Sequence, residues 1–390
     1  MPAPTATLER SLAPTKHPEL TELERLTSHL TPADIEELGA RFEAIRQRVI
    51  AERGEKDATY IRRIVKLQRT LEVAGRGMLY LGFLPPFLVG GVAALGLSKI
   101  LDNMEIGHNV MHGQYDFMND DRLHSRQFEW DTAAPSANWK HGHNYLHHTF
   151  TNVIGKDRDI GYGILRMTEE KPWKPTDVFN PVKAFLLMVF FQWGVALHDL
   201  EVEKLRSGET QWEDVEEFAR LIRHKAKRQA LKDYVLFPLL GGPLAPVVFA
   251  GNVGANLVRN LWAFSIIFCG HFPDGVALFT EEEIEGETRG QWYLRQMLGS
   301  ANIEGGDTFH VLSGNLSHQI EHHLFPDLPA RRYADIAVEV RELCEQYDLP
   351  YESGGLTRQL GQVWRKIVKL GLPGPGDVSS WLQRRRDRRS

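Results

Sequence analysis

Apolar side chains recur with a helical period at two places in the chain, and each place predicts an amphipathic helix. Thr31 and Pro32 have the order of an N-cap followed by proline at the first helical position. Apolar residues then recur every three or four positions as far as Val49, before Gly54 ends the pattern. Such a helix either packs on a folded domain or lies on a membrane surface. The same period after Pro329 predicts a second amphipathic helix.

The apolar tract 77–98 predicts the first helix that enters a membrane. It carries no formal charge over 22 residues, which is about 33 Å of helix against a hydrocarbon core of about 30 Å. The histidine motifs described below must reach one compartment, so an even number of crossings must separate them. This requires a helical hairpin around Pro85 and Pro86, whose first arm runs back through Arg76 and Glu72.

Two further apolar tracts predict additional membrane segments. The tract 235–258 is uncharged, and 260–270 extends it after a single arginine. Because this length is too great for one crossing, the glycines at 251 and 254 predict a break between two short antiparallel spans. The tract 185–197 is shorter, and three interpretations stay open for it: a span, a re-entrant segment or an interfacial helix.

These segments predict an all-α membrane protein with about four transmembrane helices and a cytoplasmic helical cap. Basic residues before the first span and in the C-terminal tail place both ends in the cytoplasm by the positive-inside rule. The first thirty residues are polar and lack the apolar run of a cleavable signal. We expect a cytoplasmic extension with an amphipathic helix over 1–70, a membrane domain over 71–330, and cytoplasmic helices with a basic tail over 331–390.

Composition narrows the class of protein further. A net charge of -5 argues against a general nucleic-acid binder. The two cysteines exclude a disulfide scaffold and a four-cysteine metal site. Histidine is the unusual component, since 11 of the 16 fall within 108–148 and 310–323. Scattered core histidines do not cluster in this way.

Two histidine motifs come before the second apolar tract. His108 and His112 are four residues apart, so on a helix both rings lie on one face. His143 and His147 repeat this spacing, while His148 is rotated by about 100° and is placed to serve a neighbouring ion.

A third motif contains His318, His322 and His323 and follows the same logic. His271, alone at the end of an apolar tract, is by its spacing an interfacial residue. We expect structural roles for the remaining histidines of the central and C-terminal regions, which are His124, His141, His198, His224 and His310.

The number of histidines favours two redox-active ions. Imidazole suits zinc, copper, iron and nickel, but eight or nine rings exceed what one tetrahedral ion uses, and the first motif lacks the glutamate of a zinc hydrolase. Glu105 and Glu321 are placed to orient ring nitrogens. Asp157 and Asp159 could do the same, although pairing with the adjacent Lys156 and Arg158 is the favoured interpretation. An oxidisable pair of ions beside a membrane indicates oxygen activation against a lipid-soluble substrate.

The motifs HNVMH, HNYLHHTFTN and HQIEHHLFP, in this order and separated by apolar tracts, resemble the three histidine boxes of the membrane fatty acid desaturase family. The resemblance covers roughly residues 75–335, and the flanking sequences look most like bacterial acyl desaturases. It implies a helical membrane domain with a cytoplasmic di-iron cap. Such an enzyme uses molecular oxygen and two electrons to insert a cis double bond into a long acyl chain.

The resemblance also implies a set of metal ligands. His271 matches an additional ligand between the second and third boxes, and either His318 or Gln319 fills one position of the third box. The second box departs from many members by one extra residue before its paired histidines. The predicted ligands of the two iron ions are His108, His112, His143, His147, His148, His271, His318, His322 and His323. The residues predicted to support them are Glu105, Gln319, Glu321 and Asp157.

The implied partners are a long-chain acyl substrate, membrane lipid and a separate electron donor, but no nucleic acid. Many eukaryotic relatives carry a fused haem domain marked by His-Pro-Gly-Gly, whereas His17 and Pro18 continue here as Glu-Leu. We therefore expect a ferredoxin-type donor with its reductase, and a location in a bacterial cell membrane. The bacterial character favours the ninth carbon of a saturated acyl-coenzyme A, although no motif reports chain length or carrier. The alternatives are a membrane di-iron hydroxylase or monooxygenase and a histidine-rich membrane metal-binding protein, which is disfavoured because transporters place ligands near the membrane midplane.

Overall fold

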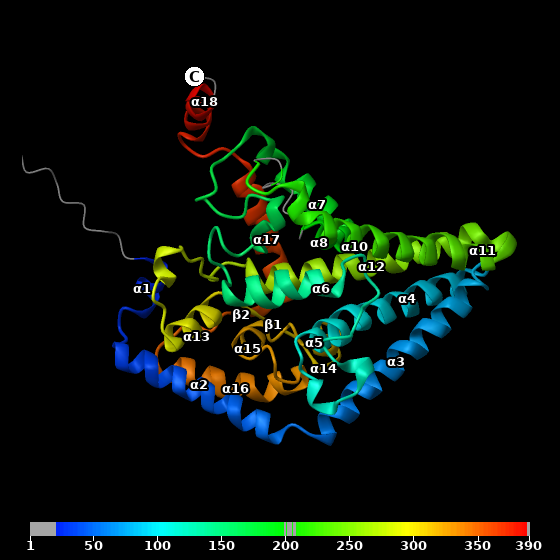
Figure 1. The fold of residues 1–390 in the computed structure, drawn as a ribbon, viewed down its shortest axis with the longest axis horizontal. Coiled ribbons are helices and arrows are strands. Elements are labelled where there is room, and N and C mark those ends of the chain that lie inside the picture. Colours follow the sequence, from blue (N-terminus) through cyan, green and yellow to red (C-terminus); the bar gives the residue numbers. More distant parts are fainter. Residues whose placement is uncertain (1–20, 199, 201–204, 206–207, 388–390) are drawn as a thin grey trace, which may run out of the picture.

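A computed structural model describes residues 21–198, 200, 205 and 208–387 of the chain (Figure 1). The polar first twenty residues, including His17, and the end of the predicted basic tail lie outside the described residues. The described part is mostly helical, as predicted. It also contains a two-stranded parallel sheet, in which β1 (Asn302–Glu304) pairs with β2 (Ser353–Gly355). The all-α prediction therefore holds except for this short sheet.

The elements follow one another along the chain as shown in Figure 1. The α-helices are α1 (Glu22–Thr27), α2 (Pro32–Glu52), α3 (Glu55–Leu79), α4 (Pro85–Leu101), α5 (Asn109–Met111), α6 (Ser136–Trp139), α7 (Asn180–Val189), α8 (Phe191–His198), α10 (Trp212–Leu231), α11 (Phe237–Leu240), α12 (Ala245–His271), α13 (Arg289–Leu298), α14 (Asp307–Leu312), α15 (Gln319–Leu324), α16 (Tyr333–Gln346), α17 (Leu356–Gly371) and α18 (Asp377–Asp387). The π-helical segments are Asp102–His108, Lys140–His147 and Lys232–Leu236. The 3₁₀ turns are Asp116–Met118, Asp121–Leu123, Ile160–Gly163, Pro175–Phe179, Gly242–Leu244, Glu282–Ile284 and Ala330–Arg332.

Two helical hairpins form the elongated end of the molecule, at the right of Figure 1. In the first, α3 ends at Leu79 and α4 begins at Pro85, and the two helices pack along their length. The hairpin predicted around the two prolines is therefore confirmed. The uninterrupted helix predicted over 77–98 is wrong, because a turn divides this tract and the apolar helix continues to Met111.

The second hairpin turns between α11 and α12, and it corrects another prediction. The predicted break at residues 251 and 254 is wrong, since α12 is continuous from Ala245 to His271. The turn lies earlier, where Gly242 has φ +54° and Pro243 follows. Gly251 is a packing position instead, because a Cβ there would lie 2.4 Å from the Leu79 side chain of α3. A glycine that reads as a helix breaker in the sequence here allows two helices to approach closely.

The third apolar tract forms a bent pair of helices. α7 and α8 meet at an angle of 100°. Within the described residues, Pro85–Met111 and Gly242–His271 are long and apolar enough to cross a membrane, and the bent pair is a third candidate.

A buried charged network separates the apolar hairpins from the rest of the molecule. The Lys99 ammonium lies 2.8 Å from Asp233 and 3.2 Å from Asp131. Arg259 of α12 is also buried and donates to the backbone carbonyl of Asp131. Because unpaired charges are costly beside lipid, such residues turn inward and pair. The network ties α4, α12 and the helix that follows α10 to the loop before the second histidine box.

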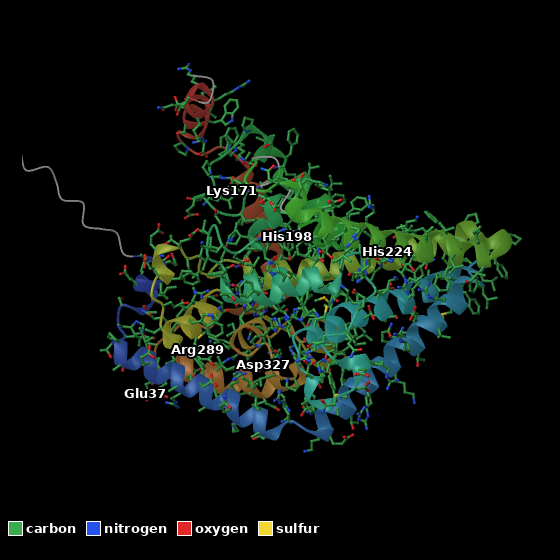
Figure 2. All side chains as sticks on the ribbon, in the orientation of Figure 1. Glu37, Lys171, His198, His224, Arg289 and Asp327 are labelled. Atoms are coloured by element: carbon green, nitrogen blue, oxygen red, sulfur yellow. The ribbon has the colours of Figure 1, made fainter. Side chains whose placement is uncertain are left out.

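The opposite end of the molecule is a helical cap with its own core. α2, α13 and α16 bury apolar side chains against one another, among them Phe42, Tyr293 and Val340. Both predicted amphipathic helices are thus confirmed, and α2 packs on the domain rather than lying free for a membrane surface. Figure 2 labels Glu37 and Arg289 on this end, away from the hairpin tips.

Asn260 of α12 satisfies the backbone groups left open by the bend between α7 and α8. Its amide donates to the Val189 carbonyl at 2.8 Å and accepts from the Gln192 N–H at 3.4 Å. We expect Asn260→Ala to lower the free energy of unfolding by about 1–3 kcal/mol, because the Val189 carbonyl loses its donor. Thermal unfolding in detergent, followed by circular dichroism, tests this. Ser265→Ala is the matched control on α12, because it removes only a hydroxyl bonded to the helix's own carbonyl. Equal unfolding temperatures for both variants would contradict this role.

Candidate metal centre

The first histidine box lies at the end of a widened helical turn. His108 closes the π-helical segment Asp102–His108, and His112 follows α5. Gly107 makes this turn feasible, because a Cβ there would lie 2.7 Å from the Asp102 carbonyl and 3.1 Å from Trp130. The two histidine rings lie side by side with centroids 4.6 Å apart. The predicted convergence of this pair is therefore seen, although on a π-turn of the kind often found at functional sites.

The second box is also π-helical, over Lys140–His147. The His143 and His147 rings stack with centroids 5.0 Å apart. His148 points elsewhere, as its one-residue offset predicts: its ring lies 4.7 Å from His112 and 4.5 Å from His323. His148 thus also reaches His112 of the first box, while His147 and His148 both lie beside His323.

The third box forms the short, fully buried helix α15. His322 lies 4.8 Å from both His108 and His112, measured between ring centroids. His323 points the other way, 4.8 Å from His271 and 5.0 Å from His147. Adjacent residues on one helix turn therefore divide between two clusters.

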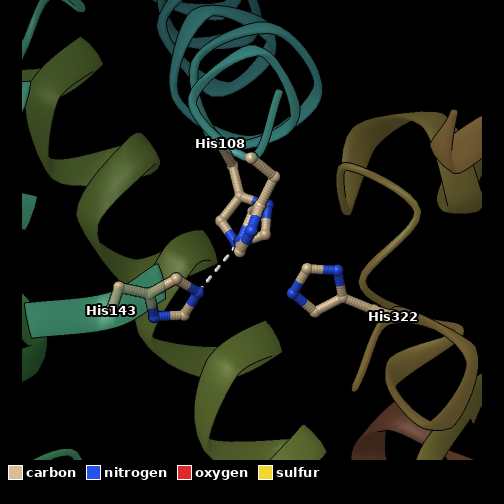
Figure 3. A group of neighbouring side chains, drawn as sticks. His108, His143 and His322 are labelled. Atoms are coloured by element: carbon tan, nitrogen blue, oxygen red, sulfur yellow. Dashed lines mark hydrogen bonds between the residues drawn. The ribbon is translucent and has the colours of Figure 1, made fainter. Parts of the chain in front are cut away.

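The rings form two groups, and within each group the ligand nitrogens all lie within 4.8 Å of one another. A further set, His143, His147 and Asp159, connects the two groups. In Figure 3, His108, His143 and His322 come from three separate segments and point toward a common centre. His148 lies between the two groups and contacts rings of both. Group one consists of His108, His112, His143 and His322, and group two consists of His147, His271 and His323.

Two positions differ from what the motif spacing indicates. His271 is not an exposed interfacial residue: it is buried at the end of α12, with Nε2 3.3 Å from Nε2 of His323. His318 lies outside both groups, because it precedes α15 and its ring stacks on His310 at 4.5 Å. Gln319, the next residue, contacts group two instead: its amide nitrogen lies 2.9 Å from Nε2 of His271.

Comparison with known proteins bears directly on this arrangement. A profile of the family described as fatty acid desaturase matches residues 83–355, which include every residue of both groups. The chain belongs to the fatty acid desaturase family. It is 49% identical over 350 residues to the NADPH-dependent stearoyl-CoA 9-desaturase of Mycobacterium tuberculosis, covering 89% of this chain and 82% of that protein.

More distant relatives extend the same family. The sn-1 linoleoyl-lipid 6-desaturase of Synechocystis is 24% identical over 275 residues, covering 68% of this chain and 76% of that protein. Fatty acid desaturase 3 of Bos taurus is 28% identical over 244 residues, covering 60% of this chain and 51% of that protein. The predicted family and enzyme class are therefore confirmed: the protein is a fatty acid desaturase, an oxidoreductase of lipid metabolism. Its apolar helices and its family indicate association with a membrane.

Carboxylates orient two rings of this desaturase. Nδ1 of His147 lies 3.0 Å from both oxygens of Asp157, to which it donates. Nδ1 of His143 lies 3.5 Å from Asp159, which also pairs with His198 of α8 (Figure 2). The favoured interpretation, in which Asp157 pairs with Lys156, is wrong, because Lys156 pairs with Glu281. The expectation that His198 is merely structural missed its contact with Asp159.

Neutral groups hold the Nδ1 side of three more rings. His323 donates to the Gln296 amide oxygen at 3.1 Å, and His108 lies 3.3 Å from the Asn109 amide oxygen. The Tyr333 hydroxyl lies 3.4 Å from Nδ1 of His322. Sequence reasoning missed these partners, since nothing in a motif marks them. With Nδ1 occupied, the Nε2 atom of each ring is left to face the centre.

Glu105 and Glu321 do not orient ligand rings, contrary to prediction. Glu105 accepts hydrogen bonds from Tyr60 and Asn315. Glu321 accepts from Tyr351 and Asn302 in a matching arrangement. Both carboxyls are buried and tie the box segments to neighbouring elements. The imidazole near Glu321 is that of His318, 4.0 Å away, which lies outside both groups. Burial of Glu321, opposed by these hydrogen bonds, raises its pKa to about 7.

The rings outside the apolar spans are electrically suited to bind a cation. Burial, together with neighbouring rings, holds the pKa of His112, His148, His322 and His323 well below the usual value. These imidazoles are therefore neutral at pH 7, with a lone pair available. His147 is the exception: burial alone would lower its pKa, but Asp157 and Asp159 outweigh it and raise the pKa to about 9.

Several buried ring nitrogens have no hydrogen-bond partner. They include Nε2 of His112, His147 and His322 and both ring nitrogens of His148. A buried polar atom without a partner is costly, and a metal ion would satisfy all of these at once. An all-nitrogen donor set of this kind fits a redox-active transition metal such as iron. The residues present thus fit a metal site in this desaturase.

Metal binding by group two should tighten as the pH rises towards 9. His147, with its raised pKa, is protonated in the metal-free protein, and an ion must displace this proton. His112 and His322 of group one carry no proton to release at neutral pH. Titration of the metal-free protein with ferrous iron between about pH 6.5 and 9 should show one pH-dependent site and one nearly constant site.

The same pKa shift affects the stability of the metal-free fold in the opposite direction. Stability falls as the pH rises, whereas metal affinity increases. Because the folded pKa of His147 exceeds the unfolded value, its proton stabilises the fold below pH 6.5, and this contribution is lost as the pH rises through about 9. Asp157→Asn removes the main charge that raises this pKa, so it should flatten both pH profiles. A pH-dependent group-two site that persists in Asp157→Asn would contradict the assignment.

An open cavity adjoins the groups of histidines. His108, His143 and His271 form one side of it. Arg259 and Asn260 are among its polar walls. The larger apolar side chains that line it are Met104, Trp130, Trp139, Phe191, Ile267 and Leu316.

Proposed function

We propose that this desaturase introduces a cis double bond into a saturated long-chain acyl-coenzyme A, at the ninth carbon, using two iron ions and molecular oxygen. The observation that carries the proposal is the pair of buried histidine groups, with unpartnered nitrogens, beside a largely apolar cavity. The printed name of the Mycobacterium relative supports the acyl carrier and the position of the double bond.

The two histidine groups would each hold one ion. His148, whose ring nitrogens have no hydrogen-bond partner, would be a further ligand of one of the two ions. Gln319, rather than His318, would hold the His271 ring in place. Bound iron supplies the activation of oxygen and the removal of two hydrogens from adjacent carbons. The protein's own contribution is to orient the rings through Asp157, Asp159 and Gln296.

The cavity would hold the acyl chain beside group one. Trp139 packs at 4.4 Å against the His143 ring and also lines the cavity, so it would place the chain near the metal and exclude water. Apolar walls favour a hydrocarbon by the ordinary hydrophobic effect. The polar wall at Arg259 and Asn260 would accept the oxygen-bearing end of the substrate better than a methyl end.

We further propose that four helices enter the membrane, with the active site facing the cytoplasm of a bacterial cell. The two hairpins supply these helices as α3, α4, the α10–α11 run and α12. Exposed basic residues on α3, such as Arg62 and Arg69, lie on the side of the hairpins away from their apolar tips. In this proposal, segment 71–330 is the membrane domain, and segments 1–70 and 331–390 are cytoplasmic. α2 and α16, which lie in the two outer segments, share a core with the middle segment.

Electrons would come from a separate ferredoxin-type protein and its reductase. The word NADPH-dependent in the name of the Mycobacterium relative supports a reductase that uses NADPH. We expect purified desaturase to turn over only when NADPH, reductase and ferredoxin are all added. Full activity from NADPH with the desaturase alone would refute the separate donor.

Expression in a desaturase-deficient host tests the function directly. Chromatography of total fatty acids with location of the double bond should show a new monounsaturated acid. A product with an added oxygen and no double bond would identify a hydroxylase instead. His147→Ala should give no product while the protein remains in the membrane fraction, and the matched variant His310→Ala, which lies outside both groups, should retain it.

A further inference from the structure

The bent pair α7 and α8, here called the elbow (Asn180–His198), has one apolar face that no part of the described protein covers. Its sequence carries one charged residue, Lys183, whose ammonium pairs with Asp177 just before α7. α7 is ten residues long, about 15 Å, which is roughly half the thickness of a hydrocarbon core. The elbow is therefore apolar in the manner of a membrane segment, while α7, which meets α8 at 100°, is too short to cross a membrane by itself.

The exposed side chains of α7 lie on one side of the helix. Val182, Phe185 and Leu186 are spaced three and four residues apart, so they share a face. Phe190 continues this face into the bend. The exposed fraction of each of these four side chains is about half, between 49% and 55%. A contiguous exposed patch of large apolar side chains marks an interaction surface.

The opposite side of the elbow packs against the protein, and a polar side chain pairs with the backbone groups at the bend. Both helices pack against α12. Val189 and Gln192, at the bend, have their open backbone groups paired with the Asn260 side chain. Interrupted helices are tolerated at membrane depth when another side chain satisfies the freed groups in this way. Gln192 and Val195 of α8 line the cavity, so the elbow contributes to the cavity wall as well as the exposed face.

The position of Asn260 gives the depth of the elbow along α12. Towards the hairpin tip, α12 exposes Phe249, Val253 and Val258. From Asn260 to His271, most residues of α12 are buried, and the distance is about 16 Å. The elbow is thus fixed where α12 passes from an apolar exposed surface to the interior of the cap. Val258, two residues before Asn260, is exposed, so the elbow lies beside the end of this apolar surface.

We propose that the elbow lies in the acyl-chain region of the leaflet next to the cap, with α7 along the membrane surface and its apolar face among the lipid chains. The occupant of this face is lipid, because the face carries no charge and lies beside the apolar surface of α12. The proposal goes beyond the proposed reaction and depends on membrane association alone.

Fluorescence quenching by spin-labelled lipid tests the proposal. Leu186→Cys, labelled with an environment-sensitive fluorophore, is placed in vesicles of phosphatidylethanolamine and phosphatidylglycerol that contain lipids with a nitroxide at a defined chain position. The native Cys269 and Cys344 are buried and stay unlabelled. The matched control is Val338→Cys on α16, another exposed apolar residue but on the cap. Labels on the elbow should be quenched at least twofold more than the control.

The depth profile and a second variant make the test decisive. Shallow nitroxides, near the glycerol backbone, should quench the elbow more strongly than nitroxides near the chain end. Val182→Cys should give the same result and replaces Leu186→Cys if that variant does not fold. Quenching equal to the Val338→Cys control would overturn the proposal. A second result would also overturn the proposal. If the label in detergent becomes less accessible to water as the protein concentration rises, a second copy of the protein covers the face. Neither readout uses desaturase activity, so failure of the proposed reaction leaves it unaffected.

Discussion

Replacement of His322 by alanine should abolish product formation and lower the iron content from the proposed two ions per chain to one or none. His322 is fully buried and its ring contacts His108, His112 and His148. Mutation of a residue that only orients a ligand ring lowers metal affinity or activity about 10–100-fold. Loss of the ligand ring itself should have a larger effect. We therefore expect a loss of more than about 100-fold, measured as product per chain together with iron analysis of the purified protein.

His318→Ala is the matched control for this experiment. His318 belongs to the same motif, but its ring stacks on His310 outside both groups. The control should keep its iron and at least half of its activity. If His318→Ala lost iron and His322→Ala did not, the assignment of the third box would be reversed. Activity in both His322→Ala and His147→Ala would remove the basis for two histidine-bound ions.

The second large effect is expected from Asp157→Asn. Asp157 accepts from Nδ1 of His147 and from the backbone N–H groups of Asn152 and Asp159. It therefore fixes the ring and the loop that follows the second box at the same time. Asparagine keeps the size but loses the charge, so iron affinity or activity should fall about 10–100-fold. Iron retained after dialysis at controlled free iron, compared with the wild-type protein, measures this.

Lys156→Gln is the control beside it. Lys156 precedes Asp157 but its ammonium pairs with Glu281 on the surface. A surface ion pair contributes little, so this variant should bind iron as the wild type does. A loss in Lys156→Gln comparable to that in Asp157→Asn would indicate that the loop as a whole, rather than the aspartate–histidine contact, supports the site.

Local patterns in the chain were sufficient for several elements of the fold. The helix from Pro32 and the helix after Pro329 were predictable because caps and a period near 3.6 residues depend on neighbours along the chain. The turn at Pro85 was predicted for another reason, because histidine motifs that reach one compartment require an even number of crossings. The prediction at Gly251 was wrong. In the sequence, a glycine that breaks a helix cannot be distinguished from one that allows close helix packing, and only the position of Leu79 shows which applies.

The three histidine motifs, and with them the class of enzyme, were determined by the sequence alone. Residues four apart share a face where the segment is helical, which predicted the pairs His108–His112 and His143–His147. The same spacing failed for His318 and His322, because α15 begins only at Gln319. Which rings face which centre was decided by tertiary structure. His322 and His323 are neighbours in the chain, yet α15 directs them into different groups. The place of His271, the position of Gln319 instead of His318, and the partners of Glu105 all depend on segments distant in sequence. Contacts across such distances arise from how helices pack around shared volume, and no short stretch of residues encodes them.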